Sequence, residues 1–205
     1  GRPAAAGGAA PWSIATGLAR AAPSEWPDDP GGATCFAAAD LDELYDGPLH
    51  LGGGELRRFS AGGVPVELAV WGDLDGGGAC NLDDLVADLP PIMEAHAARF
   101  DGTMPFERYV FVLMLSAEAY GGLEHRTSSA NLAGNAVFAT RKSYEGLLEL
   151  LSHEFFHAWN GKRLAPPALH RFDYRQEAYT RCLWIVEGVT SYYDRLAVRL
   201  TGRMS

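Results

Sequence analysis

The spacing of apolar residues in the last third of the chain predicts a helix that begins near Ser143, a residue suited to the N-cap position. The apolar side chains that follow recur at intervals of three and four residues, which is the period of one helix face. They are Tyr144, Leu147, Leu148, Leu151, Phe155 and Ala158. We expect this stripe to pack on the core, and Gly161 to end the helix.

Other apolar runs predict strands. Tyr109–Leu115 is continuous and rich in residues that favour strands, so we expect it to be buried. Val64–Trp71 carries a proline at its second position, which predicts an edge strand or the beginning of a strand. A further short strand is expected at 135–140.

A second helix is expected to begin at Asn81, because Asp84 follows three positions later in the pattern of a capping box. Pro90 and Pro91 should break or kink this helix, since proline has no N–H and its ring collides with the preceding turn. Another helix should then run to about Phe100.

A change in amino-acid composition along the chain suggests two parts. Residues 1–78 are rich in glycine, proline and alanine with short apolar segments, which indicates a small β-rich unit. The three glycines at 76–78 are the expected boundary. Residues 79–205 would form an α+β unit that contains the buried strand and two chemically interesting helices.

Composition narrows the function classes. The net charge of −9 argues against nucleic acid and against an anionic membrane surface as partners. No apolar run approaches the length of a membrane span, and the three cysteines form neither a zinc ribbon nor a disulfide framework. The first residue is Gly1 rather than methionine, so the lack of a secretory signal says nothing about the compartment.

The most informative stretch is His153-Glu154-Phe155-Phe156-His157. Two histidines four residues apart lie on one face of a helix, so both imidazoles can reach one metal ion. Glu154 can then face a water on that ion and take its proton. The alternative interpretation is that His153 and His157 are ordinary polar residues on a solvent-exposed helix face. A second feature of the sequence makes this alternative less favourable.

That second feature is Glu187, which interrupts the apolar run from Cys182 to Val189. A buried carboxylate without a partner is costly, and a zinc ion would be a strong partner. With His153 and His157 it would complete a site of two histidines and one glutamate. A structural ion pair is the alternative, and it would be preferred if the histidine pair were absent.

A third feature, Gly121-Gly122-Leu123-Glu124-His125, follows the predicted strand at Tyr109–Leu115. Two glycines let backbone come close to a ligand, and Glu124 would lie at the edge of a cleft, where it could pair with an ammonium group. A glycine turn with a solvated Glu124 is equally favoured by spacing alone.

Together these tracts resemble the glycyl aminopeptidase family of zinc metallopeptidases, a branch of the thermolysin-like gluzincins. The matching tracts run from Gly121 to His125, from His153 to Arg163 and from Leu183 to Asp194. The most specific parts are the residues after His157 and the tract Glu-Gly-Val-Thr-Ser-Tyr-Tyr-Asp at 187–194. The resemblance implies an α+β catalytic fragment of thermolysin-like fold, preceded by the tail of a β-rich domain, in a longer protein.

The resemblance also implies roles for individual residues. Zn²⁺ would be bound by His153, His157 and Glu187, and Glu154 would be the general base. Glu124, with Gly121 and Gly122, would contact the free amine of the substrate.

One position departs from the thermolysin pattern, in which an aspartate one turn after the third ligand steadies a zinc histidine. Here that position is Ser191, and Asp194 two turns on lies on a similar face. Asp194 is equally compatible with a surface pair with Arg195 or Arg199. Tyr192 and Tyr193 are near enough to donate to an oxyanion, although helix packing explains them too, and the donor can lie beyond Ser205.

The leading functional hypothesis is a zinc aminopeptidase that hydrolyses peptides after a small N-terminal residue, glycine or alanine, by way of a metal-bound water activated by Glu154. A metalloendopeptidase and a non-catalytic, zinc-stabilised binding module are the alternatives. The expected partners are peptides with a free N-terminus, together with further domains of the same chain, but no nucleic acid or membrane. A soluble location in the cytoplasm or periplasm of a bacterium is expected, and the compartment stays open.

Overall fold

A five-stranded mixed sheet is the centre of the computed structural model, which describes residues 12–21, 34–72, 80–117, 119–170 and 172–204. The strand order is β5-β6-β7-β9-β8. Their bounds are β5 Glu55–Ala61, β6 Val64–Trp71, β7 Tyr109–Leu115, β8 Gly121–Glu124 and β9 Ser128–Ala133. The central strand β7 runs parallel to β6 and β9, and the two outer pairs are antiparallel.

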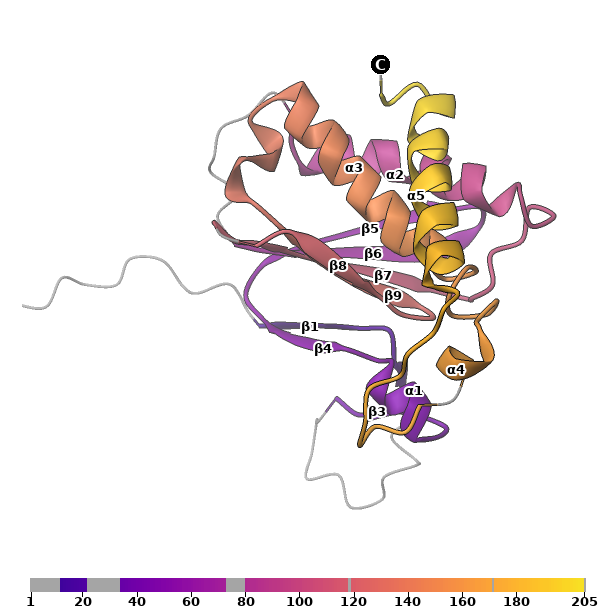
Figure 1. Ribbon diagram of the computed structural model, residues 1–205. Coiled ribbons are helices and arrows are strands. Elements are labelled where there is room, and N and C mark those ends of the chain that lie inside the picture. Colours follow the sequence, from indigo (N-terminus) through magenta and orange to yellow (C-terminus); the bar gives the residue numbers. More distant parts are fainter. Residues whose placement is uncertain (1–11, 22–33, 73–79, 118, 171, 205) are drawn as a thin grey trace, which may run out of the picture.

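Three long helices cover one face of this sheet (Figure 1). They are α2 Leu82–Ala97, α3 Arg141–Phe156 and α5 Leu183–Leu200. The main core lies between this helical layer and the sheet, where Tyr109, Phe111 and Phe155 are fully buried. Because successive strand residues point to opposite faces, Val110 and Val112 of β7 face away from the helices and pack with Ala15.

A smaller unit lies on that opposite face (Figure 1). Strand β1 Ser13–Thr16 pairs with β4 Leu49–Gly52, and β2 Ala19–Arg20 pairs with β3 Phe36–Ala37. The short helix α1 Leu41–Tyr45 begins at Asp40, whose side chain accepts from the Glu43 N–H. The short helix α4, Pro167–His170, follows α3 and precedes α5 along the chain.

The predicted apolar stripe of α3 is confirmed, since all its members are buried, but the predicted ends of this helix are wrong. Its N-cap is Thr140, and Ser143 is the third helical residue of a capping box in which each side chain satisfies the other's backbone N–H. The helix ends at Phe156 with His157 as C-cap, and Gly161 (φ 126°) turns the chain four residues later.

Pro90 and Pro91 do not break α2, which runs through both as one helix, so the separate helix expected after them is wrong. A kink at the prolines stays a prediction. A proline inside a helix costs about 3 kcal/mol. Leu89, Ile92 and Met93 around the pair are fully buried in the core, and this packing outweighs the local cost. The capping box of Asn81 and Asp84 at the start of α2 is confirmed.

Strand β6 is not an edge strand, because it lies between β5 and β7. Pro65 is tolerated because the parallel pairing with β7 begins only at Val66, so the proline marks the start of the strand. The expected strand at 135–140 is instead the 3₁₀ helix η2, Asn135–Phe138, which leads the chain from β9 into α3.

The sheet takes β5 and β6 from before the boundary predicted at 78 and its other strands from after it. The chain from Glu55 onward therefore contributes to one sheet, while the division of the protein into domains stays a prediction. The glycines at 76–78 lie outside the described residues. In the described part of the chain, none of the helices has the length and apolarity that a membrane span requires.

Candidate metal centre

Helices α3 and α5 bring three metal-ligand side chains to one point. The Nε2 atoms of His153 and His157 lie 3.1 Å apart, because the two residues are separated by one helical turn. The Oε2 atom of Glu187, from the first turns of α5, lies 3.2 Å from the first of these nitrogens and 3.5 Å from the second. Such an arrangement is one of two groups of donor atoms in the described residues that are close enough to share an ion.

The hydrogen bonds of the two rings fix where their lone pairs point. His157 donates from Nδ1 to the backbone oxygen of Asn160 at 2.7 Å, and His153 donates from Nδ1 to the carboxylate of Asp194 at 2.8 Å. In the neutral imidazole that binds a metal, the one N–H is then on Nδ1 and the lone pair is on Nε2. Two lone pairs and a carboxylate oxygen that face one another are stable around a shared cation, and the donor set fits Zn²⁺.

Asp194 lies behind His153 and is 6% exposed. Asp194 does not form the alternative surface ion pair with Arg195, since the guanidinium of Arg195 pairs with Glu149. A carboxylate on the second nitrogen of a metal-binding histidine fixes the orientation of the ring and raises its basicity. Burial alone would lower the pKa of His153, but the hydrogen bond to Asp194 and the surrounding carboxylates outweigh burial and raise the pKa.

Asn160 fixes the second ring and was missed by the sequence analysis. Its backbone oxygen accepts from His157, while its side-chain amide donates to the backbone oxygens of Ile185 and Val186 and to Thr190. One residue therefore ties the turn after α3 to the start of α5. The only signal in the sequence is its place three residues after His157.

A buried chain of hydrogen bonds continues behind Asp194. The Oγ of Ser152 donates to the backbone oxygen of Asp194 at 3.0 Å, and Nε2 of His96 lies 2.8 Å from the same Oγ. Burial lowers the pKa of His96 to about 3, so this ring is neutral at ordinary pH. The chain joins all three helices of the layer directly behind the histidine pair.

Glu187 corrects one premise of the sequence analysis. Its side chain is 46% exposed rather than buried, and Leu183, Trp184 and Ile185 before it are exposed too. The apolar run at the start of α5 is therefore not a core segment, because this end of the helix lies at the open side of the site. The carboxylate nevertheless points at both histidines.

Glu154 lies on the inner side of the same helix turn and is 5% exposed. Burial raises the pKa of its carboxyl to about 7, with His153 opposing this shift and Glu124 adding to it. Oxygen atoms of Glu124 and Glu154 and a nitrogen of His157 lie within 4.8 Å of one another. A carboxyl with this pKa can take up and return a proton near neutral pH.

Gly122 makes room for Glu154. A Cβ atom at Gly122 would lie 2.3 Å from the Cδ of Glu154, far inside any tolerable contact. The two glycines form part of the edge strand β8 rather than a turn, and what comes close to the backbone of Gly122 is the glutamate of α3. Gly121 has φ 146° and an open space where its Cβ would be.

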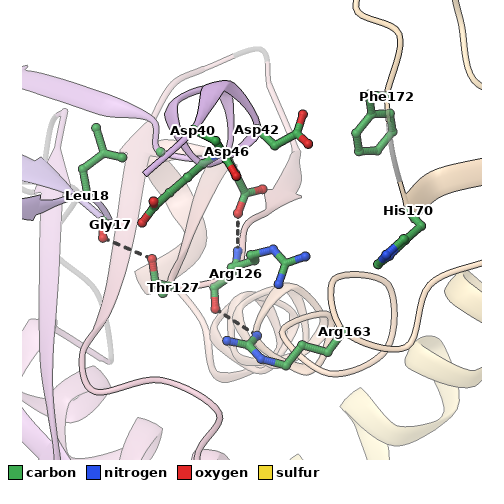
Figure 2. Close-up of a pocket in the computed structure, with 12 residues that line it drawn as sticks. Gly17, Leu18, Asp40, Asp42, Asp46, Arg126, Thr127, Arg163, His170 and Phe172 are labelled. Carbon is green, nitrogen blue, oxygen red and sulfur yellow. Dashed lines mark hydrogen bonds between the residues drawn. The ribbon is translucent and has the colours of Figure 1, made fainter. Parts of the chain in front are cut away.

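Two hollows lie on the Glu124 side of the site, and the smaller one reaches the cluster at Glu124. The smaller has a volume of about 280 Å³ and is lined by Glu124 and Val186 together with residues of α1 and of the loop after α4. The larger, about 760 Å³, shares Asp42, Asp46 and Arg126 with the smaller. Neither hollow is lined by the candidate ligands His153, His157 and Glu187. Figure 2 shows its charged walls, with Asp40, Asp42 and Asp46 on one side and Arg126 and Arg163 on another.

Asp46 joins the smaller unit to the site. Its carboxylate accepts from the backbone N–H of Arg126 at 2.7 Å and pairs with Lys162 at 2.9 Å (Figure 2 shows the first contact). Burial alone would raise the pKa of Asp46, but the contacts with His125, Lys162 and Arg126 outweigh burial and lower it. One side chain of the N-terminal unit thus holds both Arg126, just after β8, and Lys162, in the segment that follows α3.

Comparison with known proteins agrees with this picture. Residues 146–205 match the family model described as M61 glycyl aminopeptidase. A crystal structure of an aminopeptidase N family protein from Idiomarina loihiensis is 32% identical, with a TM-score of 0.82, over 95% of this chain and 32% of that one. None of the curated proteins gives a significant match.

A mutant of an M1 zinc metallopeptidase from Deinococcus radiodurans shares the fold, with a TM-score of 0.56 and 18% identity over 93% of this chain and 39% of that one. The present chain therefore spans about a third of the length of the solved structures that it matches. The family match covers most of α3 and all of α5, the two helices that carry the candidate ligands, and the structural match covers nearly all of the chain. The family match and the structural likeness together support a glycyl aminopeptidase-like family for this chain, which has the mixed helix-and-sheet fold of aminopeptidase N-type fragments.

Proposed function

We propose that this chain is the metal-binding part of a zinc aminopeptidase. The observation that carries the proposal is the convergence of three acceptors, His153, His157 and Glu187, beside the buried carboxyl of Glu154. The match to the glycyl aminopeptidase model supports peptide hydrolysis as the reaction class.

His153, His157 and Glu187 would hold the ion. Zn²⁺ in such a site polarises a carbonyl and lowers the pKa of a water towards about 7. Asp194 and the backbone of Asn160 keep the two rings in the tautomer that a metal requires.

Glu154 would move the proton. Its carboxylate takes the proton of the attacking water and afterwards gives it to the leaving amine as the C–N bond breaks. A pKa of about 7 suits both steps, because the carboxyl then exchanges its proton at little cost near neutral pH. Gly122 holds no side chain at this point, so the carboxyl stays between β8 and the histidines.

Glu124 would recognise the free amine. Its carboxylate lies close to Glu154 and His157 but belongs to the other wall, at the end of β8. An extended residue spans about 3.3–3.6 Å, so an amine at Glu124 leaves the next peptide bond near Glu154. A preference for N-terminal glycine or alanine is the part of the proposal that rests on the family's description alone.

Replacing Glu124 by alanine tests amine recognition in the protein at its natural length. Cleavage of alanyl and glycyl substrates should fall by about 10- to 150-fold, because a charge-assisted contact contributes about 1.5–3 kcal/mol. Cleavage of the matched N-acetylated peptides should change little. Steady-state kinetics on both substrates measures the difference.

Glu177→Ala is the matched control, since Glu177 is an exposed acid in the loop before α5 and lies outside the cluster. Equal losses on free and acetylated substrates would mean that Glu124 is structural, and the endopeptidase alternative would then be favoured. A zinc-loaded protein that hydrolyses neither substrate would support the non-catalytic binding module instead.

Gly122→Ala tests the placement of Glu154. The added methyl group should displace the Glu154 carboxyl and lower kcat by about 100-fold, because a misplacement of about 1 Å has effects of that size. Zinc content should stay at the wild-type level. Gly146→Ala on α3 is the control, since its Cβ would meet nothing within 4 Å. A Gly122→Ala enzyme with kcat within twofold of wild type would show that Glu154 does not act from this position.

A further inference from the structure

Two polar side chains are fully buried in the helical layer, directly behind the proposed metal ligands. His96, in the last turn of α2, is 0% exposed, and Ser152, the residue before His153 on α3, is 1% exposed. The ring centroids of Phe155 and Phe156 lie 6.0 and 5.0 Å from that of His96. Polar groups in such apolar surroundings lower stability unless they are hydrogen-bonded, so packing alone does not explain this pair.

The directions of the two hydrogen bonds follow from the chemistry of the groups. The backbone oxygen of Asp194 can only accept, so the Ser152 hydroxyl donates to it, at 3.0 Å. Nε2 of His96, which lies 2.8 Å from the same Oγ, is then the donor to Ser152. Because His96 is neutral at ordinary pH, its Nδ1 carries no proton, and this atom has no partner among the described residues. His96 thus directs the Ser152 hydroxyl towards α5 and leaves its own second nitrogen unpaired.

Asp194 is held by two consecutive residues of α3. Its carboxylate accepts from Nδ1 of His153 at 2.8 Å, while its backbone oxygen accepts from Ser152. Two contacts from one turn of α3 fix both the distance and the rotation of α5 at this point. Glu187 lies two turns before Asp194 on the same helix, so the same contacts place its carboxylate.

The other side of Glu187 is fixed by Asn160, whose amide donates to the backbone oxygens of Ile185 and Val186. The start of α5 is therefore tied to the turn after α3, and its middle is tied to Ser152, with Glu187 between the two ties. A metal centre depends on such control, because its ligands have to stay within about 0.2 Å of their ideal distances.

We propose that Ser152 and His96 are positioning residues of the metal centre. Ser152 sets the place of α5, and with it Asp194 and Glu187, against the histidine pair. His96 orients the Ser152 hydroxyl. The inference rests on the proposed function, because it takes the histidine pair and Glu187 as the ligands. Neither residue touches the ion or the substrate in this role, so the effect should appear in the affinity and geometry of metal binding.

The test measures zinc affinity by competition with a chelator, in the protein at its natural length. Ser152→Ala should weaken zinc binding about tenfold, as the loss of groups that orient metal ligands does. When Co²⁺ replaces zinc, the visible spectrum of this variant should differ from that of the wild type, because the spectrum reports ligand geometry. His96→Leu should act in the same direction, whereas His96→Gln keeps an N–H donor and should retain most of the affinity.

Tyr144→Phe is the matched control. The Tyr144 hydroxyl, in the first turn of α3, donates to Asp88 of α2 at 3.0 Å, so it also joins two helices of the layer but lies far from the ligands. Loss of this bond should lower the melting temperature of the zinc-free protein and leave zinc affinity unchanged.

The double variant Ser152→Ala, His96→Leu separates positioning from stability. Replacing both partners of a buried hydrogen bond by apolar groups can leave stability almost unchanged. The zinc-free double variant should therefore melt close to the wild type and still bind zinc about tenfold more weakly. Recovery of zinc affinity together with the melting temperature would show that the pair acts only through stability, and would overturn the inference.

The single variant also separates this inference from the proposed function. A wild type that binds zinc, with Ser152→Ala equal to it in affinity and cobalt spectrum, overturns the inference alone. A wild type that binds no zinc overturns the proposed function as well.

Discussion

Replacing Glu154 by glutamine should lower kcat by about 10²–10⁴-fold, which is the usual contribution of a positioned general base. Zinc content should stay near the wild-type level, because the amide removes the proton acceptor but none of the groups proposed to hold the ion. The expected signature is thus a folded, metal-loaded protein with little turnover. Metal analysis and steady-state kinetics on the same preparation measure both properties.

Glu145→Gln is the matched control on the same helix, since Glu145 pairs with Arg141 at the far end of α3. This variant should retain zinc and turnover. Near-normal hydrolysis of an alanyl or glycyl substrate by Glu154→Gln would contradict the assignment of the base. Loss of zinc together with turnover would instead place Glu154 among the ligands.

Replacing His153 by alanine should remove both zinc binding and activity. The Nε2 atom of His153 is the proposed ligand atom and faces His157 and Glu187. The side chain is part-exposed, so its removal leaves no large cavity in the core. A ligand that binds only the folded state stabilises it. Zinc should therefore raise the melting temperature of the wild type and leave that of His153→Ala unchanged.

Asp194→Asn provides a graded comparison for the same experiment. The asparagine keeps the size of the side chain but weakens its hold on Nδ1 of His153, so zinc affinity should fall by about 10- to 100-fold. A His153→Ala protein that is still stabilised by zinc to the wild-type extent would contradict the proposed ligand set.

Local patterns explain why part of the site could be predicted from the sequence. A spacing of four residues puts His153 and His157 together in any helix, and the structure has both on α3 and its C-cap. The buried strand Tyr109–Leu115 could also be predicted, because a short, continuous apolar run of residues that favour strands is typical of a buried strand. Both features depend only on residues that are close in sequence.

Features that depend on distant contacts could not be predicted. Pro90 and Pro91 stay inside a helix only because core packing supports them, and Asn160 matters only because α5 lies beside it. The aromatic stack of Tyr45 on Tyr174 is formed by residues that no local pattern connects. The pair Gly121-Gly122 predicts a close approach to the backbone, but no local pattern identifies Glu154 as the neighbour of Gly122.

The position of zinc in a crystal is the most direct test of the account. An anomalous-scattering map at the zinc edge should give one strong peak about 2.0–2.1 Å from the Nε2 atoms of His153 and His157, with Glu187 as the carboxylate ligand. The chain also offers a second group of donors, Glu124, Glu154 and His157. A peak at that second group, or none in zinc-soaked crystals, would contradict the proposed metal centre and the role of Glu154 as the base.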